Sequence, residues 1–347
     1  MNRSHRRSLT ISFLALLITA LFLGSGASVA RADNGPHGDY TATTDACAGC
    51  HRAHTAGAPR LLLDDVPNLC YTCHGSGGNG ADTNVVDGIY LERDLDTEDP
   101  AEGIAGRGLK GGGFVNALMD TDWDGAATSA PTTSSHLVDG STGTAWGNGD
   151  IGSGPGATIP LSCTSCHDPH GRASTTGGPT YRLLRAIPVN SGATTGVDVE
   201  DEVDKVYTVS DTAQKSGNQY FGEDYGTQGD QLSEWCSQCH TRYLAPGGSG
   251  STDSGDPIFA YRHLTQGSPS CSLCHDVHGG TLPTGGPMFS HDVTCVTCHV
   301  AHGTSASMGG YAENVEWPDG ATDPSGNNRS SLLRVDNRGT CQLCHGK

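Results

Sequence analysis

Apolar positions are sparse along this chain and are unevenly distributed. One continuous apolar run covers residues 9–23, and after it no long segment repeats hydrophobic residues at helical spacing. Residues 203–209 form a short strand-like run, and residues 308–328 are interrupted by Gly, Asn and Pro in the manner of a loop. The pattern predicts a mostly irregular fold with much coil, short helical turns and a few short strands or hairpins, without sharp domain boundaries.

Residues 1–32 have the organisation of a secretory signal peptide. Three arginines precede the apolar run, and the small-x-small sequence Ala30-Arg31-Ala32 follows it, with Ser28-Val29-Ala30 as an alternative cleavage site. A membrane anchor is the competing interpretation, but the apolar run is short for a helix that spans a bilayer. We therefore expect export through the periplasm and a secreted, extracellular mature chain of residues 33–347 with no membrane span.

Every cysteine of the chain belongs to one of seven Cys-x-x-Cys-His motifs, numbered 1–7 here in chain order. Two thiols three residues apart lie on one side of a helical turn and can form two thioether bonds to one porphyrin, and the next residue, His, ligates the iron. A disulfide framework would not require a His after each pair, and a zinc protein would not repeat it so regularly. We therefore predict seven covalently attached haem c groups.

The predicted attachment residues are Cys47, Cys50, Cys70, Cys73, Cys163, Cys166, Cys236, Cys239, Cys271, Cys274, Cys295, Cys298, Cys341 and Cys344. The predicted proximal iron ligands are His51, His74, His167, His240, His275, His299 and His345.

The spacing of the motifs predicts one heptahaem unit over residues 33–347. Motifs 1 and 2 are close in sequence, as are motifs 5 and 6, and a haem-free, Gly- and Asp-rich insert covers about residues 75–162. Seven haems in 347 residues leave too little chain for a domain around each one, so neighbouring haems must share walls. The predicted architecture is organised by the chain of haems, with short helices at the binding motifs.

The composition indicates that folding depends on the cofactor. Gly contributes 50 of the 347 residues and aromatic residues only 6%. Folding therefore costs much backbone entropy and buries few large side chains. The apolar faces of the porphyrins, the thioether bonds and the iron ligands would offset this cost, so we predict that the chain without haem is unfolded.

The chain is strongly acidic, with a formal net charge of −18. This charge argues against nucleic acid as a partner and favours solubility, cationic partners or bound cations. Residues 120–125 read Asp-Thr-Asp-Trp-Asp-Gly, like the start of a calcium loop, but the twelfth position is Pro131 rather than Glu. A loose Ca2+ site and a solvated turn are both compatible with this segment.

Eight further histidines of the mature chain are candidate distal ligands, one more than seven irons need. They are His37, His54, His136, His170, His263, His278, His291 and His302. Methionines are too few to replace them. We therefore predict six-coordinate, low-spin haems with bis-His ligation and low reduction potentials.

Four of these histidines lie three residues after a motif histidine. Three residues span at most about 10 Å, which is too short to pass around the edge of the same porphyrin. Each His-x-x-His segment should therefore tie two haems together, unless these histidines are simply exposed surface residues. The assignments in chain order are His54 to haem 2, His170 to haem 4, His278 to haem 6 and His302 to haem 7.

The other four candidates lie outside such segments. His136 and His263 precede motifs 3 and 5 and are expected to cap those haems. His37 lies close to the mature N-terminus, where a mobile segment can reach beyond its own subunit. One of these four, His291 included, is surplus to bis-His ligation or serves elsewhere.

A common arrangement recurs around several motifs. It joins Cys47–His54, Leu61-Leu62-Leu63 and Leu69–His74. Motif 3 with Leu183-Leu184-Arg185 repeats its first half, and motifs 6 and 7 with Leu332-Leu333-Arg334 between them repeat the whole. This arrangement resembles the doubled-CxxCH module of multihaem cytochromes. The acidic, secreted character and the low content of regular structure further resemble the extracellular cytochrome filaments, or nanowires, of metal-respiring microbes.

The resemblance implies a head-to-tail homopolymer with a continuous row of haems, in which a histidine of one subunit completes a haem of its neighbour. His37 is the position that matches such a donated ligand. The filament would pass electrons to redox partner cytochromes or to extracellular acceptors.

Three functions remain open at this point: an extracellular electron conduit, a monomeric periplasmic electron shuttle and a multihaem reductase. A reductase needs an iron with an open coordination position. The eight candidate distal histidines and the absence of a Cys-x-x-Cys-Lys variant from the sequence argue against one. We therefore expect electron transfer without enzymatic activity.

Overall fold

The computed structural model describes residues 37, 47–77, 81, 83–91, 106, 108–122, 126–171, 180–200, 226–244, 253–256, 294–308 and 331–338. Motifs 1, 2, 3, 4 and 6 lie in these segments. The predictions for the signal segment 1–32, the strand-like run 203–209, motifs 5 and 7, and His263, His278 and His291 fall outside the described residues, as does the predicted loop apart from residue 308. In the described segments no helix is both long and apolar enough to cross a membrane.

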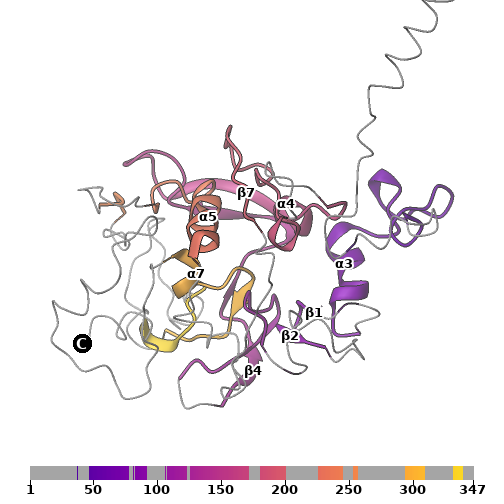
Figure 1. Ribbon diagram of the computed structural model, residues 1–347, viewed down its shortest axis with the longest axis horizontal. Coiled ribbons are helices and arrows are strands. Elements are labelled where there is room, and N and C mark those ends of the chain that lie inside the picture. The colour runs from indigo at the N-terminus through magenta and orange to yellow at the C-terminus, as the bar shows by residue number, and fades with distance from the viewer. Residues whose placement is uncertain are drawn as a thin grey trace, which may run out of the picture.

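Short helices lie at four of the described motifs (Figure 1). They are α3 (Val66–His74) at motif 2, α4 (Cys163–Cys166) at motif 3, α5 (Gly226–Ser237) leading into motif 4, and α7 (Cys295–Cys298) at motif 6. Three 3-10 turns are η2 (Pro59–Leu61), η3 (Tyr181–Leu183) and η5 (Asp336–Arg338). α3 has Pro67 in its first turn, where the missing N–H of proline costs no hydrogen bond.

The strands pair into small antiparallel sheets of two strands each. The pairs are β1 (Thr83–Asn84) with β2 (Ile89–Tyr90), β3 (Asn116–Met119) with β4 (Thr128–Pro131), β5 (Ser134–Ser135) with β8 (Gly303–Thr304), and β6 (Asp139–Trp146) with β7 (Gly156–Ser162). The β5–β8 pair joins two segments that are far apart in the sequence. It thereby ties the insert to the segment of motif 6.

The β6–β7 hairpin is the longest of these sheets and lies within the Gly- and Asp-rich insert. Its register runs from Asp139 opposite Ser162 to Trp146 opposite Gly156, with an irregularity between Asp139 and Thr142. β7 is followed directly by α4, so motif 3 lies at one end of the hairpin. Its other end, the loop after Trp146, reaches motif 4. The insert is therefore a structured support for two motifs, which its Gly- and Ser-rich sequence did not indicate.

In the part of the chain that the structure describes, buried apolar residues form two small clusters. One contains Ala117, Met119 and Val300, and the other contains Leu184, Val199 and Leu232. Val300 lies between the two histidines of the motif 6 segment, and Leu184 pairs with the histidine of motif 3. Each cluster is thus built around a motif segment, so the little apolar packing that the chain has is placed where the motifs need support.

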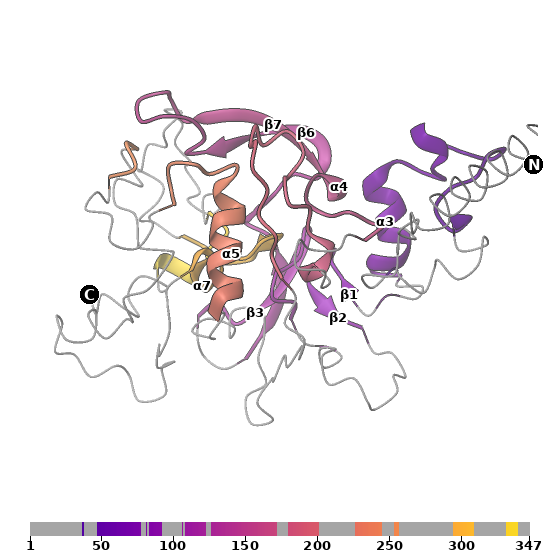
Figure 2. The same cartoon turned by 45° about the horizontal axis from the view of Figure 1, so that its top comes forward.

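The described motifs cross the molecule in chain order. Figures 1 and 2 show α3 at one edge, then α4, and then α5 and α7 towards the opposite side, with η5 beyond them. α3 packs against α4, and α5 packs against α7. The helices of motifs 2 and 3 are therefore direct neighbours, as are those of motifs 4 and 6.

Candidate functional site

The three described Cys-x-x-Cys-His-x-x-His segments share one backbone arrangement. In each, the motif histidine forms an antiparallel bridge with a leucine further along the chain. The bridges are His51 with Leu62, His167 with Leu184, and His299 with Leu333. Backbone hydrogen bonds of 2.7–3.0 Å flank each bridge. The leucine is the middle residue of each Leu-Leu-Leu or Leu-Leu-Arg sequence, so those repeats are the sequence signal of this pairing.

Two successive residues with left-handed backbone conformation precede each bridging leucine. The pairs are Arg60/Leu61, Arg182/Leu183 and Ser331/Leu332, with φ between 48° and 62°. Such backbone costs a residue other than glycine about 1–3 kcal/mol and occurs where the surrounding structure requires it. Here it turns the carbonyl oxygen of the first residue of each pair towards the motif histidine.

That carbonyl holds the imidazole. Nδ1 of His51 donates to the Arg60 carbonyl at 3.0 Å, and Nδ1 of His167 donates to the Arg182 carbonyl at 2.7 Å. The corresponding bond from His299 to Ser331 is 2.8 Å long. A histidine whose Nδ1–H is bonded in this way carries its lone pair on Nε2, which is the form that ligates metal ions.

In motifs 2 and 4, which have no second histidine three residues later, other groups bond Nδ1 of the motif histidine. Nδ1 of His240 donates to the carbonyl of Trp146 at 2.7 Å, at the end of β6. Nδ1 of His74 lies 3.0 Å from the hydroxyl of Thr83 in β1. All five described motif histidines therefore have a fixed ring orientation.

An arginine holds the turn between the two cysteines in each His-x-x-His segment. Its Nε donates to the carbonyl of the residue after the first cysteine. The bonds are Arg52 to Ala48 at 3.0 Å, Arg185 to Thr164 at 2.7 Å and Arg334 to Val296 at 3.0 Å. Arg185 and Arg334 directly follow the bridging leucine. In motif 1 that position is Leu63, and the contact is made instead by Arg52, which directly follows the motif histidine. The same contact thus arises from two sequence positions, and the sequence analysis did not identify it.

Capping boxes further fix the cysteine turn in motifs 3 and 6. Ser162 and Ser165 form one around α4, and Thr294 and Thr297 form one around α7. Reciprocal side-chain bonds of this kind satisfy backbone N–H groups that a helix start leaves unpaired. They stabilise a helix of a single turn, which would not persist alone.

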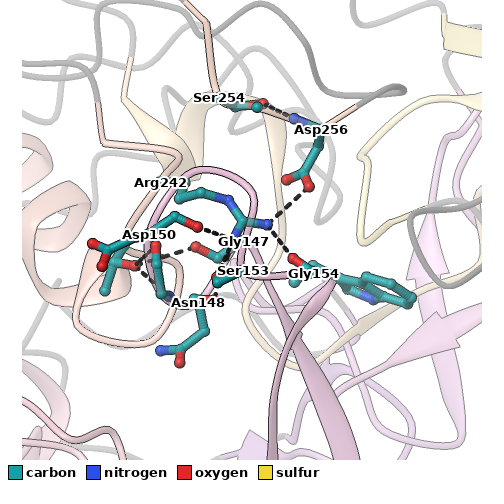
Figure 3. Close-up of polar contacts among 12 residues, drawn as sticks. Gly147, Asn148, Asp150, Ser153, Gly154, Arg242, Ser254 and Asp256 are labelled. Carbon is teal, nitrogen blue, oxygen red and sulfur yellow. Dashed lines mark hydrogen bonds and ion pairs between the residues drawn. The ribbon is translucent and has the colours of Figure 1, made fainter.

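Motif 4 is supported by a buried ion pair (Figure 3). The Arg242 guanidinium lies inside the loop between β6 and β7 and donates to the Gly154 carbonyl and to Asp256, both at 2.8 Å. Arg242 and Asp256 are each only 4% exposed. The backbone N–H of Arg242 also bonds the Gly147 carbonyl at 2.9 Å, next to the Trp146 carbonyl that holds His240. The cluster therefore anchors the acceptor of the motif 4 histidine.

Four pairs of histidine rings face each other at nearly the same separation. The ring centres lie 6.1 Å apart in His51/His170, 6.0 Å in His37/His74, 6.4 Å in His167/His302 and 6.4 Å in His136/His240. Each pair combines a motif histidine with one of the eight further histidines. Two imidazoles bound on opposite sides of one metal, with bonds of about 2 Å, have ring centres about 6 Å apart.

These pairs correct the assignments made in chain order. His170 faces motif 1 rather than motif 4, and His302 faces motif 3 rather than motif 7. His136 faces motif 4 rather than motif 3. The reason is that β-pairing and helix packing bring motifs together that are more than a hundred residues apart in the chain, so distance along the sequence does not give the partner.

His37 lies beside His74 of its own chain, and its Nδ1 donates to the Pro169 carbonyl at 3.0 Å. His54, which was assigned to haem 2, is exposed, and no described imidazole pair includes it. The assignment of His54 to haem 2 and the donation of His37 to another subunit stay predictions.

Burial keeps several of these imidazoles neutral. Desolvation lowers the pKa of His240 to about 4 and that of His302 to about 3. It also lowers the pKa of His136 and His167. Phe114 stacks on His302 with ring centres 4.6 Å apart, which accounts for part of this burial. Neutral imidazole is the ligating form, so these rings are ready to bind metal at neutral pH.

None of the ten described cysteines forms a disulfide bond. Burial raises the pKa of Cys166 to about 12, and the neighbouring Cys295 together with burial raises the pKa of Cys236. In the part of the chain that the structure describes, no three His, Cys, Asp or Glu side chains gather as a metal cluster would require.

The calcium-like segment is only partly described. Asp120 is 2% exposed and its carboxylate lies in the interior, while residues 123–125 fall outside the described part. The Ca2+ site stays a prediction.

One comparison with known proteins gave a match. Residues 39–79, which hold motifs 1 and 2, match the family described as doubled CXXCH motif. The match indicates a multihaem c-type cytochrome. No curated protein and no solved structure matches the chain. In such a cytochrome the two thiols of each motif bind haem covalently and the histidine ligates its iron. The paired cysteines, the oriented motif histidines and the facing second imidazoles found here fit that cofactor.

Proposed function

We propose that this chain is a heptahaem, bis-His c-type cytochrome that transfers electrons over long distances outside the cell as the subunit of a head-to-tail filament. The observation that carries the proposal is the set of four facing histidine pairs, at 6.0–6.4 Å. An iron with two histidine ligands has no open position for a substrate, which favours electron transfer over catalysis.

The ligand sets follow from these pairs. Haem 1 takes Cys47, Cys50, His51 and His170; haem 2 takes Cys70, Cys73, His74 and His37; haem 3 takes Cys163, Cys166, His167 and His302; haem 4 takes Cys236, Cys239, His240 and His136. Motifs 5, 6 and 7 raise the count to seven. Bound haem supplies reversible one-electron chemistry, and two imidazole ligands keep its potential low.

The role of the chain is to fix the sites relative to one another. His167 and His170 belong to two different pairs although they are three residues apart, so a single rigid segment sets the separation of two sites. His299 and His302 link motif 6 to motif 3 in the same way. Electron transfer between sites requires this short, fixed separation and no moving part.

The direction of these links supports contact with a second copy of the chain. The second histidine of the motif 3 segment reaches back to motif 1, and that of the motif 6 segment reaches back to motif 3. The equivalent residue of the motif 1 segment, His54, is exposed. The motif 1 segment lies beside α3 at one edge of the molecule (Figure 1). We therefore assign the ligand donated between subunits to His54 in place of His37. The acidic surface would keep such filaments dispersed.

Two variants test this proposal against each other. With His54→Ala, purified subunits keep their covalent haems, but the one haem that lacks its donated ligand is high-spin and filaments no longer form in cryo-EM images. With His37→Ala, filaments persist and one haem, that of motif 2, becomes high-spin. Filaments from His54→Ala would refute the assignment. Dispersed single molecules from the wild type, found in the periplasm, would favour a monomeric electron shuttle.

A further inference from the structure

The segment of motif 3, residues 163–170, lies against residues that belong to or face motifs 1, 2 and 6. We propose that this segment, here called the central segment, organises the ligand sets of motifs 1 and 2, so that losing haem attachment at motif 3 disturbs the axial ligation of both neighbours. The inference deepens the proposed function and rests on it. The proposed function states which residues ligate each haem, whereas this inference states how ligation at one site depends on haem attachment at another.

The dependence of motif 1 follows from the axial pair. Its second histidine, His170, is part of the central segment, with rings 6.1 Å apart and an interplanar angle of 12°. The side chain of His170 is 74% exposed and lies 3.6 Å from the carboxylate of Asp168 in the same segment. The position of His170 is therefore set by the fold of the central segment rather than by its own burial.

The dependence of motif 2 follows from the carbonyl of Pro169. That carbonyl accepts the Nδ1–H of His37 at 3.0 Å, and the ring of His37 then faces His74 at 6.0 Å. The same device occurs at the equivalent place in motif 6, where the Ala301 carbonyl accepts Nδ1 of His136 at 2.6 Å and His136 faces His240. The recurrence in two segments of different sequence indicates a built feature.

The attachment cysteines of motif 3 also border its neighbours. The thiols of Cys163 and Cys70 lie close enough to shift each other's pKa, where α4 packs against α3. On the other side, Trp235 and Gln238 next to motif 4 donate to the carbonyls of Arg185 and Ala186 at 2.6 and 2.8 Å. Those two residues follow the leucine that bridges to His167. Haem attachment at motif 3 therefore fixes a segment enclosed between motifs 2 and 4.

Motif 2 provides a matched control. In the described residues, none of the ligand sets of motifs 1, 3 and 4 draws an axial histidine or its acceptor carbonyl from residues 70–74. Loss of its haem should therefore leave the remaining sites ligated. Motifs 2 and 3 thus differ in what they supply to others, although each holds one haem.

The test compares Cys163→Ser/Cys166→Ser with Cys70→Ser/Cys73→Ser in the haem-loaded, full-length protein. Intact mass gives the number of attached haems, and electron paramagnetic resonance gives the number of high-spin irons. We expect each variant to lose one haem. The motif 3 variant should show high-spin iron at two further sites, and the motif 2 variant at none.

Equal spectra from the two variants, with six low-spin haems each, would overturn the inference while leaving the proposed function intact. Absence of covalent haem from the wild type would instead refute the proposed function. If the motif 3 variant is not secreted, the His170→Ala variant tests whether the central segment supplies the axial ligand of motif 1. It should keep all attached haems and give one high-spin iron at motif 1 that added imidazole returns to low spin, and an unchanged spectrum would overturn the inference.

Discussion

Motifs 3 and 4 hold their histidines in the same way by different means. In motif 3 the acceptor of Nδ1 is the Arg182 carbonyl, which a nearby left-handed turn supplies. In motif 4 the acceptor is the Trp146 carbonyl, 94 residues away, on a hairpin loop that a buried ion pair anchors. The comparison teaches that each site requires an oriented imidazole and not a particular local sequence. It also shows that motif 4 depends on distant parts of the chain.

The strongest test of this difference removes the anchor of motif 4. Arg242→Gln leaves Asp256 buried without its partner, and breaking a buried pair in this way costs about 3–5 kcal/mol. We expect a lower free energy of unfolding of the haem-loaded protein. We also expect loss of haem attachment at motif 4, because the Trp146 carbonyl is released from His240. Denaturant titration and peptide mass spectrometry of motif 4 measure the two effects.

The control for this prediction is Arg185→Gln at motif 3, whose guanidinium is half-buried and whose histidine is held locally. It should retain haem at both motifs. Loss of haem attachment at motif 3 in Arg242→Gln, with motif 4 unaffected, would contradict the comparison.

A smaller effect is expected from the arginines that hold the cysteine turn. Arg334 is 1% exposed and donates through Nε and Nη2 to the Val296 carbonyl. Arg334→Gln should therefore destabilise the protein by about 1.5–3 kcal/mol, the range for hydrogen bonds to charged groups. Arg52 makes the equivalent bond at an exposed site, so Arg52→Gln should cost less than about 1 kcal/mol. Thermal unfolding of the two variants compares them, and equal losses would show that burial is not what makes the contact important.

The smallest effect concerns the left-handed turn itself. Arg60 has φ 62° and contributes its carbonyl to His51. Arg60→Gly relieves the backbone strain and should change stability by less than about 1 kcal/mol, with ligation at motif 1 retained. Arg60→Val should be more destabilising, because a β-branched side chain is disfavoured at this φ. Thermal unfolding measures the stability of both variants. A higher melting temperature for Arg60→Val than for Arg60→Gly would show that the turn does not depend on this conformation.

The sequence was informative where the chemistry is local. The Cys-x-x-Cys-His repeats point to covalent haem, and the His-x-x-His spacing predicts that one segment serves two sites, which the facing pairs of His167 and His170 support. The Leu-Leu repeats were visible as well, although their role as bridges to the motif histidines was not.

The partner of each second histidine could not be predicted from the sequence. Which motif His170 or His136 faces is decided by helix packing and by the β5–β8 pairing across the chain. Backbone carbonyls such as those of Trp146 and Pro169 leave no signature in side-chain identity. The β6–β7 hairpin was missed because its strands are rich in Gly, Ser and Thr, which resemble loop sequence, and because tertiary contacts rather than intrinsic propensity stabilise it.

The most direct test of the central claim is the electron paramagnetic resonance spectrum of the fully oxidised wild-type protein, with the haem count taken from its intact mass. Bis-His ligation at every site, of the kind seen in the four facing histidine pairs, predicts seven covalently attached haems whose irons are all low-spin in the assembled filament. A high-spin signal accounting for one or more irons in the native protein, or a mass without attached haem, would contradict the account.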